Sequence, residues 1–240
     1  MIRLNKFLAQ SGVASRREAD RMIAEGEVRV DGRVVRELGT KVDEDRSRVE
    51  VRGRPVVREE RLVHLILYKP RGVLVTFRDP EGRPTIQRLL PKLRQRVFPV
   101  GRLDFNSEGL LFLTNDGELA LRLAHPRYET KKKYIAEVEG LPASEALDRL
   151  EKGVMLDGRR TAPAKAKLLA RGQKRSRLLV EVHEGRKHEV RRMCEAVGHP
   201  VRALKRIGFA GLTLGGLKPG QWRFLEAKEV GKLRAAAGLG

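Results

Sequence analysis

The chain of 240 residues contains a single cysteine, Cys194, and no apolar stretch that approaches ~20 residues. One cysteine excludes an internal disulfide and a cysteine-based zinc site, which favours a reducing compartment. The lack of a long apolar stretch argues against a transmembrane helix, and no charged and then apolar leader opens the chain. We therefore expect a soluble, cytoplasmic protein with no membrane partner.

Several familiar cofactor and metal motifs are also missing. The sequence has no GxGxxG fingerprint, no P-loop, no HExxH pair and no CxxC pair. The usual sequence evidence for nicotinamide, flavin, nucleotide or metal chemistry is therefore lacking.

Positive charge is present in large excess. The chain has 51 Lys and Arg against 31 Asp and Glu, a formal net charge of +20, and a pI near 10.8. Solubility does not require so one-sided a balance, so the excess predicts a polyanionic partner, above all nucleic acid. Residues 1–60 hold 14 basic and 12 acidic side chains, whereas residues 61–240 hold 37 and 19. The second part therefore supplies most of the attraction, and the first must bind through local placement.

The first 60 residues have the pattern of a small independent unit. Leu4, Phe7 and Leu8 share one helix face, and the capping box Ser15–Glu18 opens a second helix. The segment Val28–Val35 then alternates on both sides of an Asp-Gly turn, which is a strong hairpin signal. We expect two helices followed by a hairpin.

This pattern, RLNKFLA, SRREADRMI and GEVRVDG, resembles the small RNA-binding module named after ribosomal protein S-four. The resemblance implies that the second helix and the strand after it face RNA. The candidate RNA contacts are Arg3, Lys6, Ser15, Arg16, Arg17 and Arg29. Any one of these arginines taken alone could equally belong to a solvated helix face.

A charged stretch containing Gly and Pro, from Arg52 to Arg61, has the composition of a linker. It predicts an RNA-binding domain over residues 1–60 and a larger domain over residues 61–240. The later motifs fall on strands and loops, which favours an α+β class. We expect the larger domain to have a mixed, mostly antiparallel central sheet flanked by helices.

The most informative stretch of the larger domain runs from Pro99 to Thr114. It contains the carboxylate of Asp104, then a break at Gly109, and then an apolar run over 110–114 that predicts a buried strand. An Asp followed by Asn and Ser is also common turn chemistry, because such side chains bond back to the backbone. The residues alone leave both interpretations open.

Two further stretches carry candidate functional side chains. The run Thr130–Val138 alternates as a strand and leads from three lysines into Tyr134. After Gly185 we expect a helix in which Lys187 and Arg191, four residues apart, face the same way beside the positive helix start. A helix start flanked by cations is a natural site for an anion.

The motifs GRLD followed by GLL, KxY, and EGRxxxVRRM together resemble the RsuA-like branch of the RNA pseudouridine synthases. The resemblance covers nearly the whole chain. It implies that Asp104 is the catalytic aspartate, that Tyr134 stacks on the target base, and that Arg191 pairs with Asp104. It further implies a flipped uridine whose backbone is contacted by Arg102, Lys132 and Lys187.

The implied reaction is the isomerisation of uridine to pseudouridine in RNA. It moves the sugar from nitrogen 1 to carbon 5 of the same base, so it needs no cofactor and no metal. The extended pattern GRLDxNxxGLLxxTxDGELAxRLxHP most resembles enzymes acting on large-subunit ribosomal RNA. Alternatives are a small-subunit enzyme, a base-removing glycosylase, and a non-catalytic assembly factor that only binds ribosomal RNA. We expect a monomer.

Overall fold

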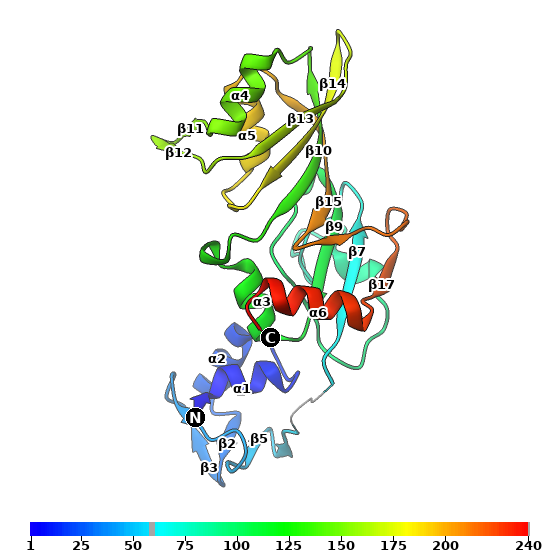
Figure 1. The fold of residues 1–240 in the computed structure, drawn as a ribbon. Coiled ribbons are helices and arrows are strands. Elements are labelled where there is room, and N and C mark those ends of the chain that lie inside the picture. Colours follow the sequence, from blue (N-terminus) through cyan, green and yellow to red (C-terminus); the bar gives the residue numbers. More distant parts are fainter. Residues whose placement is uncertain (58–60, 240) are drawn as a thin grey trace. The chain divides into compact units, whose positions relative to one another are not determined.

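The computed structural model describes residues 1–57 and 61–239 and divides into two compact units (Figure 1). The N-terminal unit holds Met1–Val63, Lys92–Phe98 and Asn115–Gly117, and the sheet unit holds the other segments, His64–Pro91, Pro99–Thr114 and Glu118–Gly240. The predicted linker and domain boundary involve residues 58–60, which lie outside the described residues. The division into 1–60 and 61–240 therefore stays a prediction. Among the described residues, no helix has the length and apolar character needed to cross a membrane.

The N-terminal unit contains the predicted helices and hairpin. Helix α1 (Leu4–Gln10) and helix α2 (Arg16–Ala24) precede strands β2 (Val28–Val30) and β3 (Arg33–Val35), which pair antiparallel. The hydroxyl of Ser15 accepts a hydrogen bond from the backbone N–H of Glu18 at 3.2 Å, so it caps α2 as the sequence indicates.

Short strands complete this unit around one apolar core. Strand β2 also pairs with β5 (Val49–Val51), β5 pairs with β6 (Arg54–Pro55), and β1 (Ile2–Arg3) pairs with β4 (Lys41–Val42). The core is formed by apolar side chains from both helices and from the strands: Leu4, Phe7, Leu8, Ala14, Ala19, Met22, Ile23, Val28, Val42 and Val49.

The sheet unit is organised around a mixed sheet with strand order β13-β14-β10-β15-β9-β7-β17. Its neighbours pair antiparallel except β15 and β9, which run parallel, so the predicted mixed, mostly antiparallel sheet is confirmed. The strands are β7 (His64–Lys69), β9 (Ser107–Thr114), β10 (Lys132–Glu139), β13 (Lys165–Ala170), β14 (Arg175–Val182), β15 (Val201–Phe209) and β17 (Trp222–Phe224).

Helices flank this sheet. Helix α4 (Ser144–Lys152) packs on β13, and helix α5 (Glu189–Ala196) packs on β15 and on the short strand β11 (Met155–Leu156) (Figure 1). Arg122 of helix α3 donates to the carbonyls of Ala237 and Gly238, just beyond helix α6 (Ala227–Ala236). The remaining short elements are α3 (Gly117–Ala124), η1 (Ile86–Leu89), η2 (Pro126–Tyr128), β8 (Phe98–Pro99), β12 (Arg159–Arg160) and β16 (Leu212–Thr213).

The sequence predicts that Gly109 breaks the chain before a strand. This prediction is wrong, because Gly109 lies inside β9, which begins at Ser107. Its φ is +115°, and a Cβ at this position would lie 2.1 Å from the carbonyl oxygen of Arg206 on the parallel strand β15. The glycine is therefore required by the close approach of two backbones, not by a turn.

Helix α5 begins later than the sequence predicts. Its N-cap is His188, which has a φ of +54°, and the helix starts at Glu189. Lys187 therefore lies in the loop before the helix. The prediction that Lys187 and Arg191 share one helix face is wrong, because the left-handed residue between them interrupts the helical geometry.

Candidate active site

A cavity of about 410 Å³ lies within the sheet unit, against strands β10 and β15. Tyr134 on β10 pairs in register with Arg206 on β15, which pairs with Gly109 on β9. The loop before β9 and the loop before α5 supply the other walls. Four of the predicted site residues line this cavity: Arg102, Asp104, Lys132 and Tyr134.

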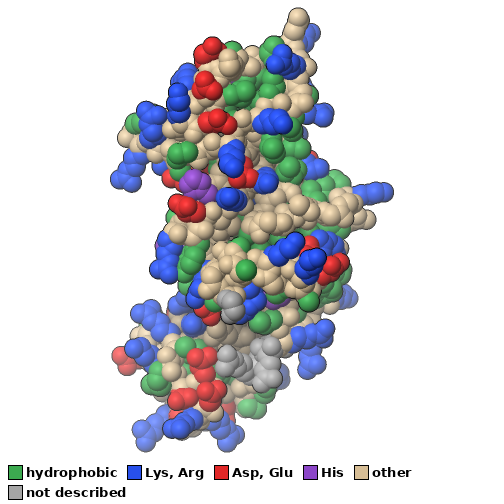
Figure 2. All heavy atoms as spheres, in the orientation of Figure 1, with side chains coloured by type: hydrophobic (Ala, Val, Ile, Leu, Met, Phe, Trp, Pro, Cys, Tyr) green, Lys and Arg blue, Asp and Glu red, His purple; other side chains and the backbone are tan. Residues whose placement is uncertain are grey.

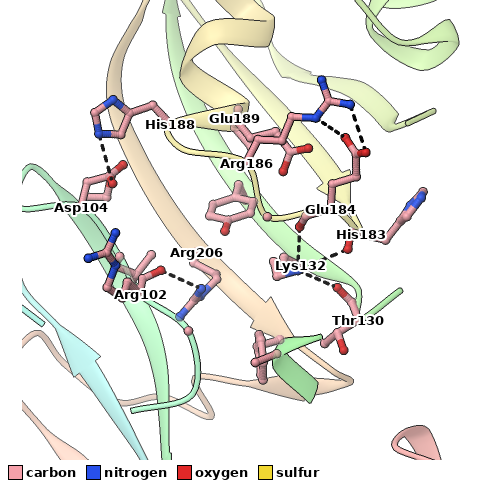
Figure 3. Close-up of a pocket in the computed structure, with 18 of the residues that line it drawn as sticks. Arg102, Asp104, Thr130, Lys132, His183, Glu184, Arg186, His188, Glu189 and Arg206 are labelled. Atoms are coloured by element: carbon pink, nitrogen blue, oxygen red, sulfur yellow. Dashed lines mark hydrogen bonds and ion pairs between the residues drawn. The ribbon is translucent and has the colours of Figure 1, made fainter. Parts of the chain in front are cut away.

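Asp104 occupies the turn that leads into β9, and its backbone carbonyl accepts from the N–H of Ser107 at 3.0 Å. Its carboxylate faces the loop before α5, where Oδ1 lies 3.4 Å from Nε2 of His188 (Figure 3). The Asp104 side chain is 39% exposed. The carboxylate is thus held at a cavity wall while remaining open to a ligand.

The turn after β7 supports the Asp104 loop. The backbone N–H of Gly72 donates to the carbonyl of Phe105 at 2.8 Å. The turn itself is held by the buried ammonium of Lys69, which donates to the carbonyls of Pro70 and Val73 at 2.9 and 2.8 Å. Burial lowers the pKa of Lys69 to about 8, although the negative charge of Asp104 opposes that change. The KPRG segment therefore positions the carboxylate without contacting it.

Arg191 does not form the predicted ion pair with Asp104. Its guanidinium donates to the carbonyls of Val201 and Asn106 at 3.1 and 3.2 Å, and to the hydroxyl of Ser107 at 3.3 Å. Burial lowers the pKa of Arg191, and the charge of Asp104 opposes this effect from a distance. Arg191 therefore fixes the end of the Asp104 loop, because its donors are directed to loop atoms.

Tyr134 is 9% exposed and lies on the cavity wall, with Val180 of β14 opposite it on one side and Arg206 on the other. An aromatic face in a cavity beside a carboxylate is suited to holding a flat heterocyclic base. Tyr134 and Asp104 therefore meet at one site, although 30 residues separate them in the sequence.

Lys132 has its ammonium occupied within the protein. It donates to the carbonyls of Thr130, His183 and Glu184 at 3.1, 3.4 and 2.7 Å (Figure 3). Burial lowers the pKa of Lys132, Glu189 opposes this effect, and Arg206 adds to it. These contacts fix the cavity loop, and the predicted phosphate contact of Lys132 stays a prediction.

Two carboxyl groups, Glu184 and Glu189, form a coupled pair in the cavity wall. Burial raises the pKa of Glu189 to about 7, and a hydrogen bond with Glu184 contributes in the same direction. Glu184 also accepts from the N–H of Ala162 at 3.1 Å and pairs with Arg186 at 3.1 Å. Glu184 is therefore the ionised partner, and Glu189 can carry a proton near neutral pH.

The other predicted residues lie outside this cavity. Lys187 is exposed in the loop before α5, and six candidates belong to the N-terminal unit, where Ser15 uses its hydroxyl as a helix cap. The five basic members of that set are exposed: Arg3, Lys6, Arg16, Arg17 and Arg29.

The groups in the cavity that the sequence analysis missed include Glu184, His188, Glu189 and Arg206. The sequence pattern of β15 could have indicated Arg206. Along β15, Leu204, Arg206 and Gly208 occupy the buried positions of an alternating strand. A charged residue in the buried phase of a strand is rare unless it is paired or functional.

Comparison with known proteins identifies the family. Residues 63–196 match the family model described as RNA pseudouridylate synthase, and residues 2–46 match the S4 domain. The chain belongs to the RNA pseudouridylate synthase family. The predicted resemblance, including the N-terminal RNA-binding module, is therefore confirmed, and the protein is an enzyme of the isomerase class.

Similar proteins match over the whole length of this pseudouridine synthase. It is 49% identical to ribosomal large subunit pseudouridine synthase B of Bacillus subtilis, with 100% of this chain and 98% of that protein covered. It is 47% identical to an uncharacterized RNA pseudouridine synthase of Aquifex aeolicus, with 99% and 96% covered. A crystal structure of a pseudouridylate synthase matches with a TM-score of 0.70 at 26% identity, covering 97% of this chain and 100% of that one.

Proposed function

We propose that this enzyme converts a uridine of large-subunit ribosomal RNA into pseudouridine, with Asp104 as the catalytic carboxylate. The observation that carries the proposal is the presence of Asp104 and Tyr134 on the walls of one cavity. The similarity to the Bacillus subtilis enzyme named for the large subunit supports the substrate. The reaction breaks the bond between N1 and C1′ and forms a bond between C5 and C1′ in the same nucleoside.

Asp104 has the properties that this reaction demands. A carboxylate can stabilise positive charge on the sugar or bond to an electron-poor carbon. The exposed carboxylate faces His188, and Arg191 holds the loop that carries it through the carbonyl of Asn106 and the hydroxyl of Ser107.

The target base must leave its stack in folded RNA to enter the cavity, at a cost of a few kcal/mol. The cavity of about 410 Å³ is within the size range of small-ligand sites, roughly 300–1,000 Å³. Tyr134 offers a stacking surface for the base, and exposed Arg102 at the cavity can contact its phosphate. Phosphate contacts offset the cost of unstacking.

RNA recruitment rests on charge in both units. Figure 2 shows Lys and Arg side chains spread over the face drawn, with acidic side chains between them. In the N-terminal unit, we assign RNA contact to Arg3, Lys6, Arg16, Arg17 and Arg29, which are exposed. Domains over 1–60 and 61–240, joined by a linker, would raise each other's effective concentration on one RNA. We propose that the enzyme acts as a monomer.

Ribosomal RNA from a strain that lacks the gene tests the substrate. The purified enzyme is incubated separately with large-subunit and small-subunit RNA, and pseudouridine is counted by mass spectrometry after nuclease digestion. New pseudouridine confined to the large-subunit RNA is the expected result. Modification of the small-subunit RNA alone would overturn the assignment, and release of free uracil would indicate a base-removing glycosylase.

A further inference from the structure

Arg206 is a buried cation with an unused donor. Its side chain is among the largest that are fully enclosed, with 2% of the residue exposed. Nε donates to the carbonyl of Leu110 at 2.7 Å, and Nη1 donates to the carbonyl of Arg102 at 3.4 Å. Figure 3 shows Arg206 directed towards Arg102. Nη2 is buried and has no hydrogen-bond partner among the described residues. Both acceptors are neutral, so the bonds that Arg206 makes leave its positive charge without an anion.

Arg206 lies where its unused donor could reach a ligand. Arg206 lines the same cavity as Asp104 and Tyr134, and it is the cross-strand neighbour of Tyr134. Its two carbonyl acceptors belong to residues on either side of the Asp104 turn. The guanidinium is thus anchored to the loop that carries the catalytic carboxylate, and its buried Nη2 amino group is left without a partner in a residue that lines the cavity.

An unpaired buried charge is expensive, and an unsatisfied buried donor adds to that cost. The surrounding groups raise the cost, because the positive charge of Arg206 contributes to the lowered pKa of both Lys69 and Lys132. The nearby anion, Asp104, has Nε2 of His188 at 3.4 Å from its carboxylate. The ring of Phe209, whose centroid lies 5.3 Å from Cζ of Arg206, offsets part of this cost. Negative charge that enters or develops inside the cavity would offset more of it.

We propose that Nη2 of Arg206 donates a hydrogen bond to a carbonyl oxygen of the target uracil and stabilises the negative charge that forms there. The inference rests on the proposed function. When the bond between N1 and C1′ breaks, its electron pair stays on the base and is shared between N1 and the carbonyl oxygens. The new C5–C1′ bond uses an electron pair of that anion. C5 then loses its proton and N1 gains one.

Negative charge reaches the uracil oxygens whichever role Asp104 has. Attack of the carboxylate on the sugar, its addition to the base, and an elimination step all place negative charge on uracil oxygens at some stage. A guanidinium fixed by two carbonyls needs no reorganisation to meet that charge. Removal of one such preorganised donor lowers the catalytic rate by roughly 100-fold in comparable sites.

The test compares two target RNAs in single-turnover reactions, one with uridine and one with 5-fluorouridine at the modified position. Fluorine withdraws electrons and stabilises the uracil anion, so cleavage of its N1–C1′ bond depends less on an external cation. Arg206→Gln is expected to slow cleavage roughly 100-fold with uridine and by a clearly smaller factor with 5-fluorouridine. RNA affinity is expected to stay within about twofold of the wild type.

The experiment also includes a control variant, Arg202→Gln, and a second variant of Arg206, Arg206→Lys. Arg202→Gln removes an exposed arginine from the same strand, where it pairs with Glu139, and is expected to leave both rates unchanged. Arg206→Lys keeps the charge and serves if the glutamine variant does not fold; its loss should also be smaller with 5-fluorouridine. Equal losses on both RNAs, or no loss with uridine, would overturn the proposal. A wild type that forms no pseudouridine would instead overturn the proposed function.

Discussion

Nε2 of His188 lies 3.4 Å from Oδ1 of Asp104, and His188 reaches this position with a φ of +54°. Both side chains are substantially exposed, at 47% and 39%. An exposed contact of this kind contributes about 0–1 kcal/mol even when both groups are charged, because water and salt screen it. The pair therefore orients Asp104 but cannot supply most of the catalytic stabilisation.

His188→Asn tests whether His188 only orients Asp104. Asparagine tolerates the left-handed backbone and removes the ring nitrogen. The single-turnover rate should fall by at most about fivefold, the equivalent of 1 kcal/mol. His199→Asn alters a histidine that bonds the Glu139 carbonyl away from the cavity, and should leave the rate unchanged. A fall in the rate of His188→Asn as large as that expected from removing a catalytic side chain would contradict the limited role of His188.

Gly109→Ala is expected to be strongly destabilising. The new methyl would lie 2.1 Å from the carbonyl oxygen of Arg206, and neither backbone can move without shifting β9 against β15. We expect the free energy of unfolding to fall by about 3 kcal/mol or more, measured by denaturant titration. Gly158→Ala is the matched control, because Gly158 has a positive φ but open space around it. Equal destabilisation by the two variants would show that the close approach is unimportant.

Glu189 should make stability depend on pH. Its folded-state pKa of about 7 lies above the ordinary value of 4.5, so folding favours the protonated form. This stabilisation is fully present below about pH 4.5 and is lost as the pH rises through about 7, with a size of roughly 1–3 kcal/mol. Glu189→Gln, which stays neutral, should remove that part of the pH dependence. The free energy of unfolding is measured by denaturation at several pH values. If it changes with pH equally in both proteins, Glu189 does not have the raised pKa.

Lys69→Met should reduce activity without altering RNA affinity. It removes the two bonds to the carbonyls of Pro70 and Val73 that hold the turn supporting Phe105. We expect a stability loss of roughly 1–3 kcal/mol and a single-turnover rate about tenfold lower, because the Asp104 loop loosens. Lys165→Met, which removes an exposed strand lysine, is the control. A wild-type rate in Lys69→Met would show that the turn does not position Asp104.

Local patterns predicted the local structure well. The helix faces of residues 4–8 and 19–23, the Ser15 cap and the Asp-Gly hairpin depend on neighbours within a few positions, so the sequence shows them directly. The mixed sheet class also followed from the pattern of strands. The parallel pairing of β15 with β9 did not, because strand order depends on contacts between residues nearly 100 positions apart.

The site was harder to predict for the same reason. Asp104 and Tyr134 stood out through their motifs, and the structure brings both to one cavity. His188 was not expected beside Asp104, because the left-handed φ of +54° with which it precedes α5 is not visible in the sequence. The basic run around Lys132 suggested RNA but gave no sign that its ammonium also donates to the carbonyls of His183 and Glu184, 51 and 52 residues away.

The most direct test of the central claim measures tritium release from RNA labelled at carbon 5 of the target uridine, because formation of the C5–C1′ bond expels that hydrogen. The wild type should release tritium without forming free uracil. Asp104→Asn, which keeps the size of the side chain and removes its charge, should bind the RNA with unchanged affinity and release none. Tritium release by Asp104→Asn at a rate close to that of the wild type would contradict the account.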